Sequence, residues 1–103
     1  MLFDSATFSS KLPHELKDLT RLEYLYVYDL ASDAALADIK NLANLKVLKL
    51  TGGNLSDAGL QFLTGLTKLA LLDLRDTHVT EAGVGDLQRA LPNSKILYGT
   101  SHR

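Results

Sequence analysis

Three histidines are the side chains in this sequence best suited to acid–base chemistry: His14, His78 and His102. A nucleophilic site needs a base held against a nucleophile and a third group that orients the base. His78 follows Asp76 and Thr77, a fragment of such a triad, but all three lie in one predicted turn and have a structural reason to be there. The histidines show no metal-ligand spacing, and the chain has no cysteine. We therefore expect no metal, no cofactor and no catalysis, with an enzyme kept as the residual alternative.

Two further patterns invite a ligand-binding interpretation. Residues 51–54 (TGGN) are rich in glycine, but they lack the lysine and the second glycine that a phosphate loop places at fixed spacing. Asp33, Asp57 and Glu81 recur at one fixed interval and suggest a row of acidic metal ligands. Each follows a serine or threonine, namely Ser32, Ser56 and Thr80. That order is typical of a helix start, where the hydroxyl caps free amide groups and the acid faces the helix dipole. We expect capping rather than metal binding.

That interval, two dozen positions, runs through most of the chain. Downstream of each cap it continues through Leu36, Leu60 and Val84, and then through Ile39, Leu63 and Leu87. A second apolar series is offset by 23 and then 24 positions: Leu22, Leu25 and Val27; Leu45, Leu48 and Leu50; Leu69, Leu72 and Leu74; then Ile96 and Tyr98. A fixed period of this length is the signature of stacked structural units.

Each unit has two halves with different periodicity. Residues 69–75 alternate between apolar and other positions, as on a strand with one buried face. In residues 60–66 the leucines recur every three residues, as on one stripe of a short helix. Turn residues separate the halves. Because each helix returns the chain to the same edge, the order predicts parallel strands and an α/β fold.

Residues 45–50 (LKVLKL) and 69–74 (LALLDL) resemble the strand pattern LxxLxL of leucine-rich-repeat proteins. Residues 79–84 (VTEAGV) resemble the turn into the helix of the 24-residue bacterial and F-box-like subclass, and residues 90–96 resemble the close of its last repeat. The resemblance covers about residues 12–98 and departs at Gly53 and Thr77, where many members carry asparagine. It implies a right-handed solenoid of about three full repeats plus partial caps, with the parallel sheet concave and the helices convex.

The ends are expected to differ from the middle, because a solenoid must cover its terminal apolar faces. We predict one domain in three parts: an N-terminal cap and partial repeat (1–18), the repeats (19–98) and a polar tail (99–103). Leu2, Phe3 and Phe8 are spare apolar residues that could fold over the first strand, predicted at Tyr24. The last strand has no predicted neighbour on its outer edge. An uncovered edge invites pairing with another chain, so a monomer is expected with weak dimerisation as the alternative.

The outward positions of the predicted strands form a candidate binding surface. Those positions hold Tyr24, Tyr26, Tyr28, Val47, Lys49, Thr51, Leu71, Asp73, Arg75, Lys95 and Leu97. Three tyrosines at period two share one face, and tyrosine is a common interface anchor because its ring buries area while its hydroxyl finds a partner. The alternatives are that tyrosine simply suits a strand, that the N-terminal cap covers the rings, and that the charged residues pair across strands.

Composition narrows the classes of partner. The chain has 11 basic and 12 acidic residues, a net charge of −1. Such a balance provides no field to attract nucleic acid or an anionic membrane. No stretch approaches the ~20 apolar residues of a membrane span, and the first residues lack a signal-peptide pattern. We expect a cytoplasmic protein that binds another protein through its strand face; the alternative is a structural or assembly role, as a self-associating unit or part of a longer repeat protein.

Overall fold

The computed structural model describes residues 5–100 and shows an α/β fold built on one parallel sheet. Five strands lie in sequence order, β1-β2-β3-β4-β5, and every neighbouring pair is parallel. The strands are β1 (Ser5–Ser9), β2 (Tyr24–Tyr28), β3 (Val47–Thr51), β4 (Leu71–Asp73) and β5 (Lys95–Leu97). The prediction of parallel strands is confirmed. Leu2, Phe3, His102 and the rest of the predicted tail beyond residue 100 lie outside the described residues.

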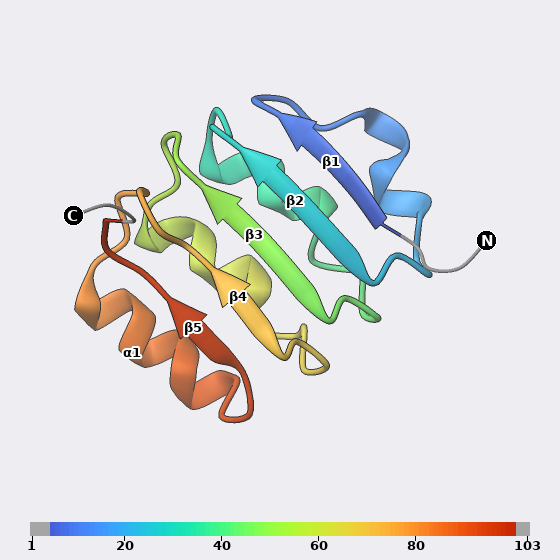
Figure 1. Cartoon of the computed structure of the whole chain (residues 1–103). Helices are drawn as coiled ribbons and strands as arrows, with labels where there is room; N and C mark the ends of the chain where they lie inside the picture. Colours follow the sequence, from blue (N-terminus) through green and yellow to red (C-terminus); the bar gives the residue numbers. More distant parts are fainter. Residues whose placement is uncertain (1–4, 101–103) are drawn as a thin grey trace.

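The helical segments lie on one side of the sheet (Figure 1). They are η1 (His14–Asp18), η2 (Asp33–Asp38), η3 (Asp57–Leu63) and α1 (Glu81–Ala90). The short helices are confirmed, but the first three are 3₁₀ helices. A 3₁₀ helix rises ~2.0 Å per residue and an α-helix ~1.5 Å, so η3 and the longer α1 both return the chain over roughly 15 Å. A five-residue strand needs about that length of return.

The N-terminal cap proved to be a strand. Ser5 pairs with Tyr24 and Phe8 with Val27, so β1 extends the sheet beside β2 instead of folding over it. Phe8 packs against the core on the helical side, away from the tyrosine row. The prediction that Tyr24 begins the first strand was therefore wrong. The register explains why: β1 precedes β2 by only 19 positions, whereas β3 precedes β4 by 24, so the fixed spacing did not reveal it.

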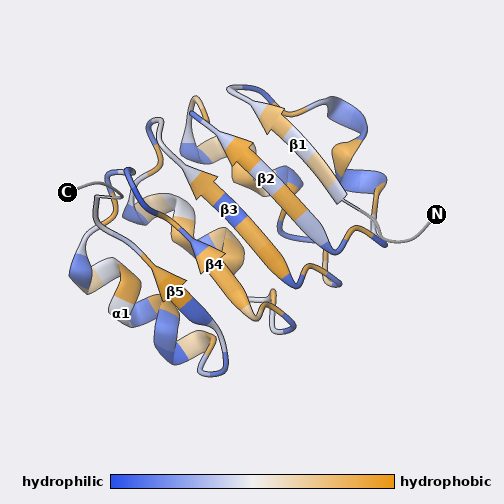
Figure 2. Cartoon of the chain, viewed as in Figure 1, coloured by the Kyte–Doolittle hydropathy of each residue, from blue (hydrophilic) through white to orange (hydrophobic). Residues whose placement is uncertain are grey.

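The core lies between the sheet and the helical segments. Fifteen of the seventeen positions in the two spaced series are buried, from Leu22 to Leu87, each at most 5% exposed; the last two differ, since Ile96 is half-buried and Tyr98 is 44% exposed. In the strands the buried positions alternate with outward ones, as Leu48 and Leu50 do around Lys49. Each buried leucine contributes about 1.5–3 kcal/mol relative to an exposed one. Figure 2 shows the apolar strands and the more polar segments that surround them.

The strands are followed by a second ladder, made of residues with positive φ. Its members are Ser10, Asp29, Gly52, Asp76 and Gly99, with φ between 59° and 92°. The amide of Ser10 donates to the carbonyl of Tyr28 at 2.8 Å, and the amide of Asp76 to that of Gly99 at 2.7 Å. These bonds continue the sheet's hydrogen bonding into the turns. The left-handed backbone then redirects the chain toward the helical side.

The acidic residues at the helix starts bind the next segment of the chain rather than their own helix. The amide and hydroxyl of Ser56 donate to the Asp33 carboxylate, at 2.8 and 2.6 Å. Thr80 donates to Asp57 in the same way, again at 2.8 and 2.6 Å. The capping prediction was therefore wrong for Ser32 and Ser56, which accept no cap bond; the hydroxyl of Ser56 donates instead to a carboxylate, a stronger bond. Only Thr80 also caps its helix, accepting from the amide of Gly83 at 3.2 Å.

A glycine makes room for each of these carboxylates. A Cβ on Gly59 would lie 2.5 Å from an oxygen of Asp33, and a Cβ on Gly83 would overlap the carboxylate of Asp57. Ala35 occupies the matching place in η2, and the residue of η1 that corresponds to Asp33 is His14, which is not an acid. We call the two sets carboxylate clamps: Asp33 with Ser56 and Gly59, and Asp57 with Thr80 and Gly83. The first clamp joins η2 to η3, and the second joins η3 to α1.

None of the helices between residues 5 and 100 combines the length and the apolar character needed to cross a bilayer.

Candidate interaction surface

The side of the sheet opposite the helical segments carries the residues predicted to bind a partner (Figure 1). We call it the open face. The strand register arranges its residues in lines that cross the sheet. The first line is Ser5, Tyr24, Val47, Leu71 and Lys95; the second is Thr7, Tyr26, Lys49, Asp73 and Leu97; the third is Ser9, Tyr28 and Thr51. Arg75 follows the end of β4 on the same face. The sequence thus placed all its candidate residues on one surface.

Most of the open face is partly accessible. Tyr28 is 44% exposed, and Tyr24, Tyr26, Val47, Lys49, Thr51, Leu71, Arg75 and Leu97 are half-buried. Lys95 is exposed. The tyrosine row of β2 is therefore partly packed and partly accessible. Such partly packed rings are already ordered, which lowers the entropy cost of a contact.

Asp73 is the exception, because it is only 1% exposed. The alternation placed it on the open face, but the prediction that it is presented to a partner was wrong. Its carboxylate is covered through its pairing with Arg75, two residues along the chain. Nε of Arg75 donates to Oδ1 at 2.9 Å, Nη2 donates to Oδ2 at 2.8 Å, and the Arg75 amide donates to Oδ1 at 3.1 Å. These hydrogen bonds to the Asp73 carboxylate all come from its own strand segment.

The two residues shift each other's pKa in the directions expected of an ion pair. Burial alone would raise the pKa of Asp73, but the hydrogen bonds from the Arg75 side chain and amide, with the positive charges of Arg75 and Lys49, lower it below its ordinary value. The hydrogen bond and charge of Asp73 raise the pKa of Arg75, and the charge of Asp76 adds to this effect. The pair is ionised throughout the neutral range.

Lys49 joins this pair to the tyrosine row. Its ammonium lies 5.4 Å from the centroid of the Tyr26 ring, within the range of a cation–π contact. In the register Lys49 is directly opposite Asp73, and its charge is one of those that lower the Asp73 pKa. The prediction that charges pair across strands is thus met in part: the direct ion pair is within the β4 segment, and Lys49 acts on it from β3.

The sequence missed the contribution of β1 to this surface. Ser5, Thr7 and Ser9 add a border of small polar side chains next to the tyrosines. The signal was present, because Ala6 and Phe8 alternate with these polar residues at the period of a strand. Five residues make a short run, and β1 lacks the regular spacing of the later units, so the alternation alone did not predict a strand there.

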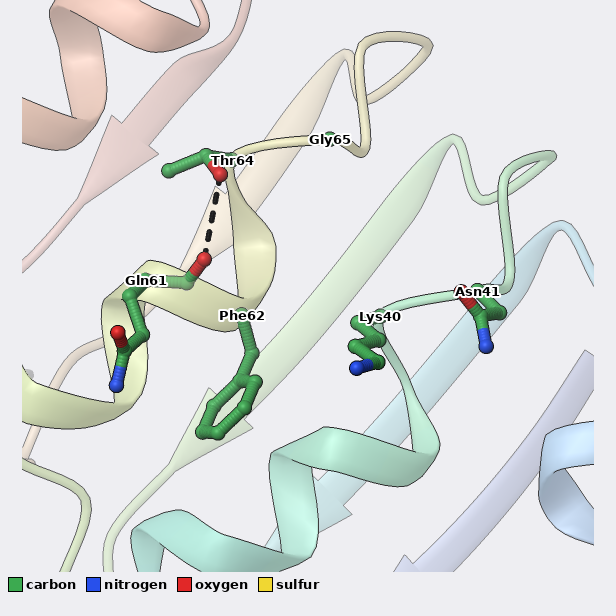
Figure 3. Close-up of a pocket in the computed structure, with 6 residues that line it drawn as sticks. All are labelled: Lys40, Asn41, Gln61, Phe62, Thr64 and Gly65. Carbon is green, nitrogen blue, oxygen red and sulfur yellow. Dashed lines mark hydrogen bonds between the residues drawn. The ribbon is translucent and has the colours of Figure 1, made fainter.

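The helical side has a shallow groove between η3 and α1, lined by Asp57, Leu60, Gln61, Thr64, Ala82, Gly83, Asp86 and Leu87. Another shallow groove lies between η2 and η3 and is shown in Figure 3. Its lining is Lys40, Asn41, Gln61, Phe62, Thr64 and Gly65. The Thr64 hydroxyl bonds to the carbonyl of Gln61 at 3.2 Å, so it serves the end of η3. The groove has no pair of titratable groups that could move a proton. Across residues 5–100 there is also no group of three or more histidines, cysteines or acids that could hold a metal ion.

Comparison with known proteins found no match: no protein-family model matches the chain, and no curated protein matches it.

Proposed function

We propose that this protein is a binding module of the leucine-rich-repeat type, which recognises another protein through its open face. The observation that carries the proposal is the composition of that face. Three tyrosines, a lysine over one ring and an arginine fixed by a buried acid lie together on the side of the sheet opposite the helical segments. Tyrosine and arginine are enriched among the residues that dominate protein interfaces.

The right-handed solenoid is part of this proposal. Its support is that consecutive parallel strands lie in sequence order and are joined by helical segments on one side. Parallel crossovers of this kind are right-handed in almost all proteins. The pairing offsets of 23 and 24 positions between β2, β3 and β4 agree with units of nearly equal length. A crystal structure of the chain with a left-handed crossover or an antiparallel pair would refute it.

The binding proposal is tested by comparing two faces of the same protein. The full chain and two variants serve as baits in affinity capture with quantitative mass spectrometry: Tyr26→Ala with Lys49→Glu on the open face, and Lys40→Ala with Gln61→Ala on the helical side. We expect the open-face variant to lose its captured proteins, the helical-side variant to keep them, and both to melt near the wild-type temperature. Capture that depends equally on both faces, or on neither, would contradict the proposal.

A second candidate is self-assembly, which the two sheet edges favour. Among the described strands, β1 and β5 each have a neighbour on one side only, which leaves a row of amide and carbonyl groups on the other. Sedimentation across a hundredfold range of concentration tests it. A dimer that Leu97→Lys dissociates would support assembly, and a monomer at every concentration would exclude it.

A further inference from the structure

We infer that the open face recognises an acidic segment of its partner, in which a carboxylate side chain stands beside an apolar one. Lys49 and Arg75 hold the carboxylate, and the apolar neighbour contacts Val47 and Leu71. This inference rests on the proposed binding function and names the chemistry of the partner for the same surface.

The first argument is the charge that the open face presents. Its cationic side chains are Lys49, Arg75 and Lys95; Asp73 is its acid on the described strands, and Asp76, in the turn beside Arg75, is a second and exposed acid. Asp73 is 1% exposed and both of its oxygens accept from Arg75, so a partner cannot reach it. The acid is buried and bound by Arg75, and the charge of Lys49 also acts on it. What a partner meets on the strands is therefore positive, although the whole chain has a net charge of −1.

The second argument is the fixed orientation of Arg75. Two of its side-chain nitrogens, Nε and Nη2, are engaged by the two oxygens of Asp73. This arrangement holds the guanidinium plane in place, while its side chain remains 37% exposed. Nη1 takes no part in the pair, so its N–H groups point in a direction that the pair sets. A group that is already ordered binds a carboxylate at a lower entropy cost than a free arginine does.

The third argument is the neighbourhood of Lys49. It lies opposite Asp73 in the register, and its charge acts on the carboxylate that Arg75 binds. Lys49, Asp73 and Arg75 together have a net charge of +1. The charge of Asp76, in the turn after β4, also acts on Arg75, so the side of the cluster toward Lys49 is the one that attracts a carboxylate. Val47 and Leu71 pair with each other one line away and are half-buried. They offer an apolar contact at the distance of a neighbouring side chain in an extended peptide.

A nucleic acid fits this surface less well. Affinity for a phosphate backbone grows with the number of cations in contact with it, typically 6–10 phosphates in a strong complex. The open face supplies three, and one of them is tied to a buried acid. A single carboxylate beside an apolar side chain matches both the number of charges and their surroundings.

The test is a selection of random 12-residue peptides, displayed on phage, against the full chain. We expect the enriched peptides to carry aspartate or glutamate two positions from an aliphatic or aromatic residue, because alternate residues of an extended peptide share a face. Lys49→Gln should weaken a synthetic peptide of that sequence about tenfold, the loss of one charge-assisted hydrogen bond. Lys40→Gln on the helical side is the matched control, and its affinity should stay within twofold. Lys49→Glu should shift the enriched peptides toward lysine and arginine.

The outcomes separate this inference from the function on which it rests. Enriched peptides without acids, whose binding Tyr26→Ala still abolishes, would overturn the acidic partner and keep the open-face function. No enrichment, or enrichment insensitive to Tyr26→Ala, would overturn both. Tighter binding of a 20-nucleotide single-stranded DNA pool, lost in Lys49→Gln, would overturn the inference in favour of nucleic acid.

Discussion

Substitution of Asp73 by asparagine isolates the buried charge at the centre of the open face. The asparagine keeps the size of the side chain but removes the charge and replaces one acceptor with an N–H₂ group, which faces the donors of Arg75. The aspartate accepts three hydrogen bonds at 2.8–3.1 Å. Hydrogen bonds to a charged group contribute about 1.5–3 kcal/mol each, but they are not additive, and burial of the charge offsets part of the gain.

We expect Asp73→Asn to lower the free energy of unfolding by about 2 kcal/mol at pH 7, because half-exposed Arg75 can turn to water when its acceptor is lost. For a chain of this size that corresponds to a fall in Tm of roughly 8–16 °C. Urea titration followed by circular dichroism measures it. Asp86→Asn is the control, since the same substitution there removes an ion pair whose partners are 82% and 78% exposed. The control should change stability by less than ~0.5 kcal/mol.

The pH dependence gives the prediction a second, independent readout. The pKa of Asp73 is lowered in the folded protein, so its ionisation stabilises the fold above the unfolded pKa of ~3.9, and this stabilisation is lost as the pH falls through the lower folded value. The difference between wild type and Asp73→Asn should be constant from pH 7 to pH 5 and shrink below about pH 4. A difference that stays constant to pH 2.5, or no destabilisation at pH 7, would refute the assignment of a buried charged acceptor.

Three further predictions test the fold, the first by comparing two glycine substitutions. Gly83→Ala should destabilise the protein by more than ~1 kcal/mol, because the new Cβ overlaps a clamped carboxylate. Gly85→Ala has open space in the same helix and should stabilise the protein by up to ~1 kcal/mol. Thermal melts of the two variants measure the difference, and equal effects would contradict the clamp. Asp33→Ala should cost about 1–3 kcal/mol in urea unfolding, since two donors of Ser56 lose their acceptor; a neutral result would show that water replaces it fully. Leu48→Ala should cost about 2–5 kcal/mol in the same assay, and a smaller loss would mean that the core collapses around the gap.

The sequence predicted the strands and the core where the spacing and the alternation agreed. In β2 and β3 the buried residues stand at alternate positions, whereas β4 buries both Leu72 and Asp73 and β5 is at most half-buried. The return segments bury leucines at every third or fourth position. Both periods follow from backbone geometry alone, so they are visible without any knowledge of contacts. β1 was missed because it precedes β2 by 19 positions, whereas the later strands are 23 or 24 positions apart, so the repeat did not reveal it.

The open face was predicted in outline but not in its electrostatics. Alternation decides the face on which a side chain lies, and it placed Asp73 correctly in that sense. It does not reveal that an arginine two residues later covers the acid. The clamps were missed for a related reason: Asp33 and Ser56 were assigned to separate local helix starts, and their bond joins residues 23 positions apart. Local patterns contain no information on such pairings until the register is known.

The carboxylate clamps also set a rule for changing the size of this molecule. A second copy of residues 36–59, inserted directly after Gly59, would bring a serine, an aspartate and a glycine at the offsets that Asp33 and Asp57 already require. Cut points two residues earlier would break the match, because an alanine would stand where the carboxylate needs an open Cα. The two hydrogen bonds and the glycine contact of each clamp therefore determine where the chain can be lengthened or grafted. The ends of its strands and helices do not.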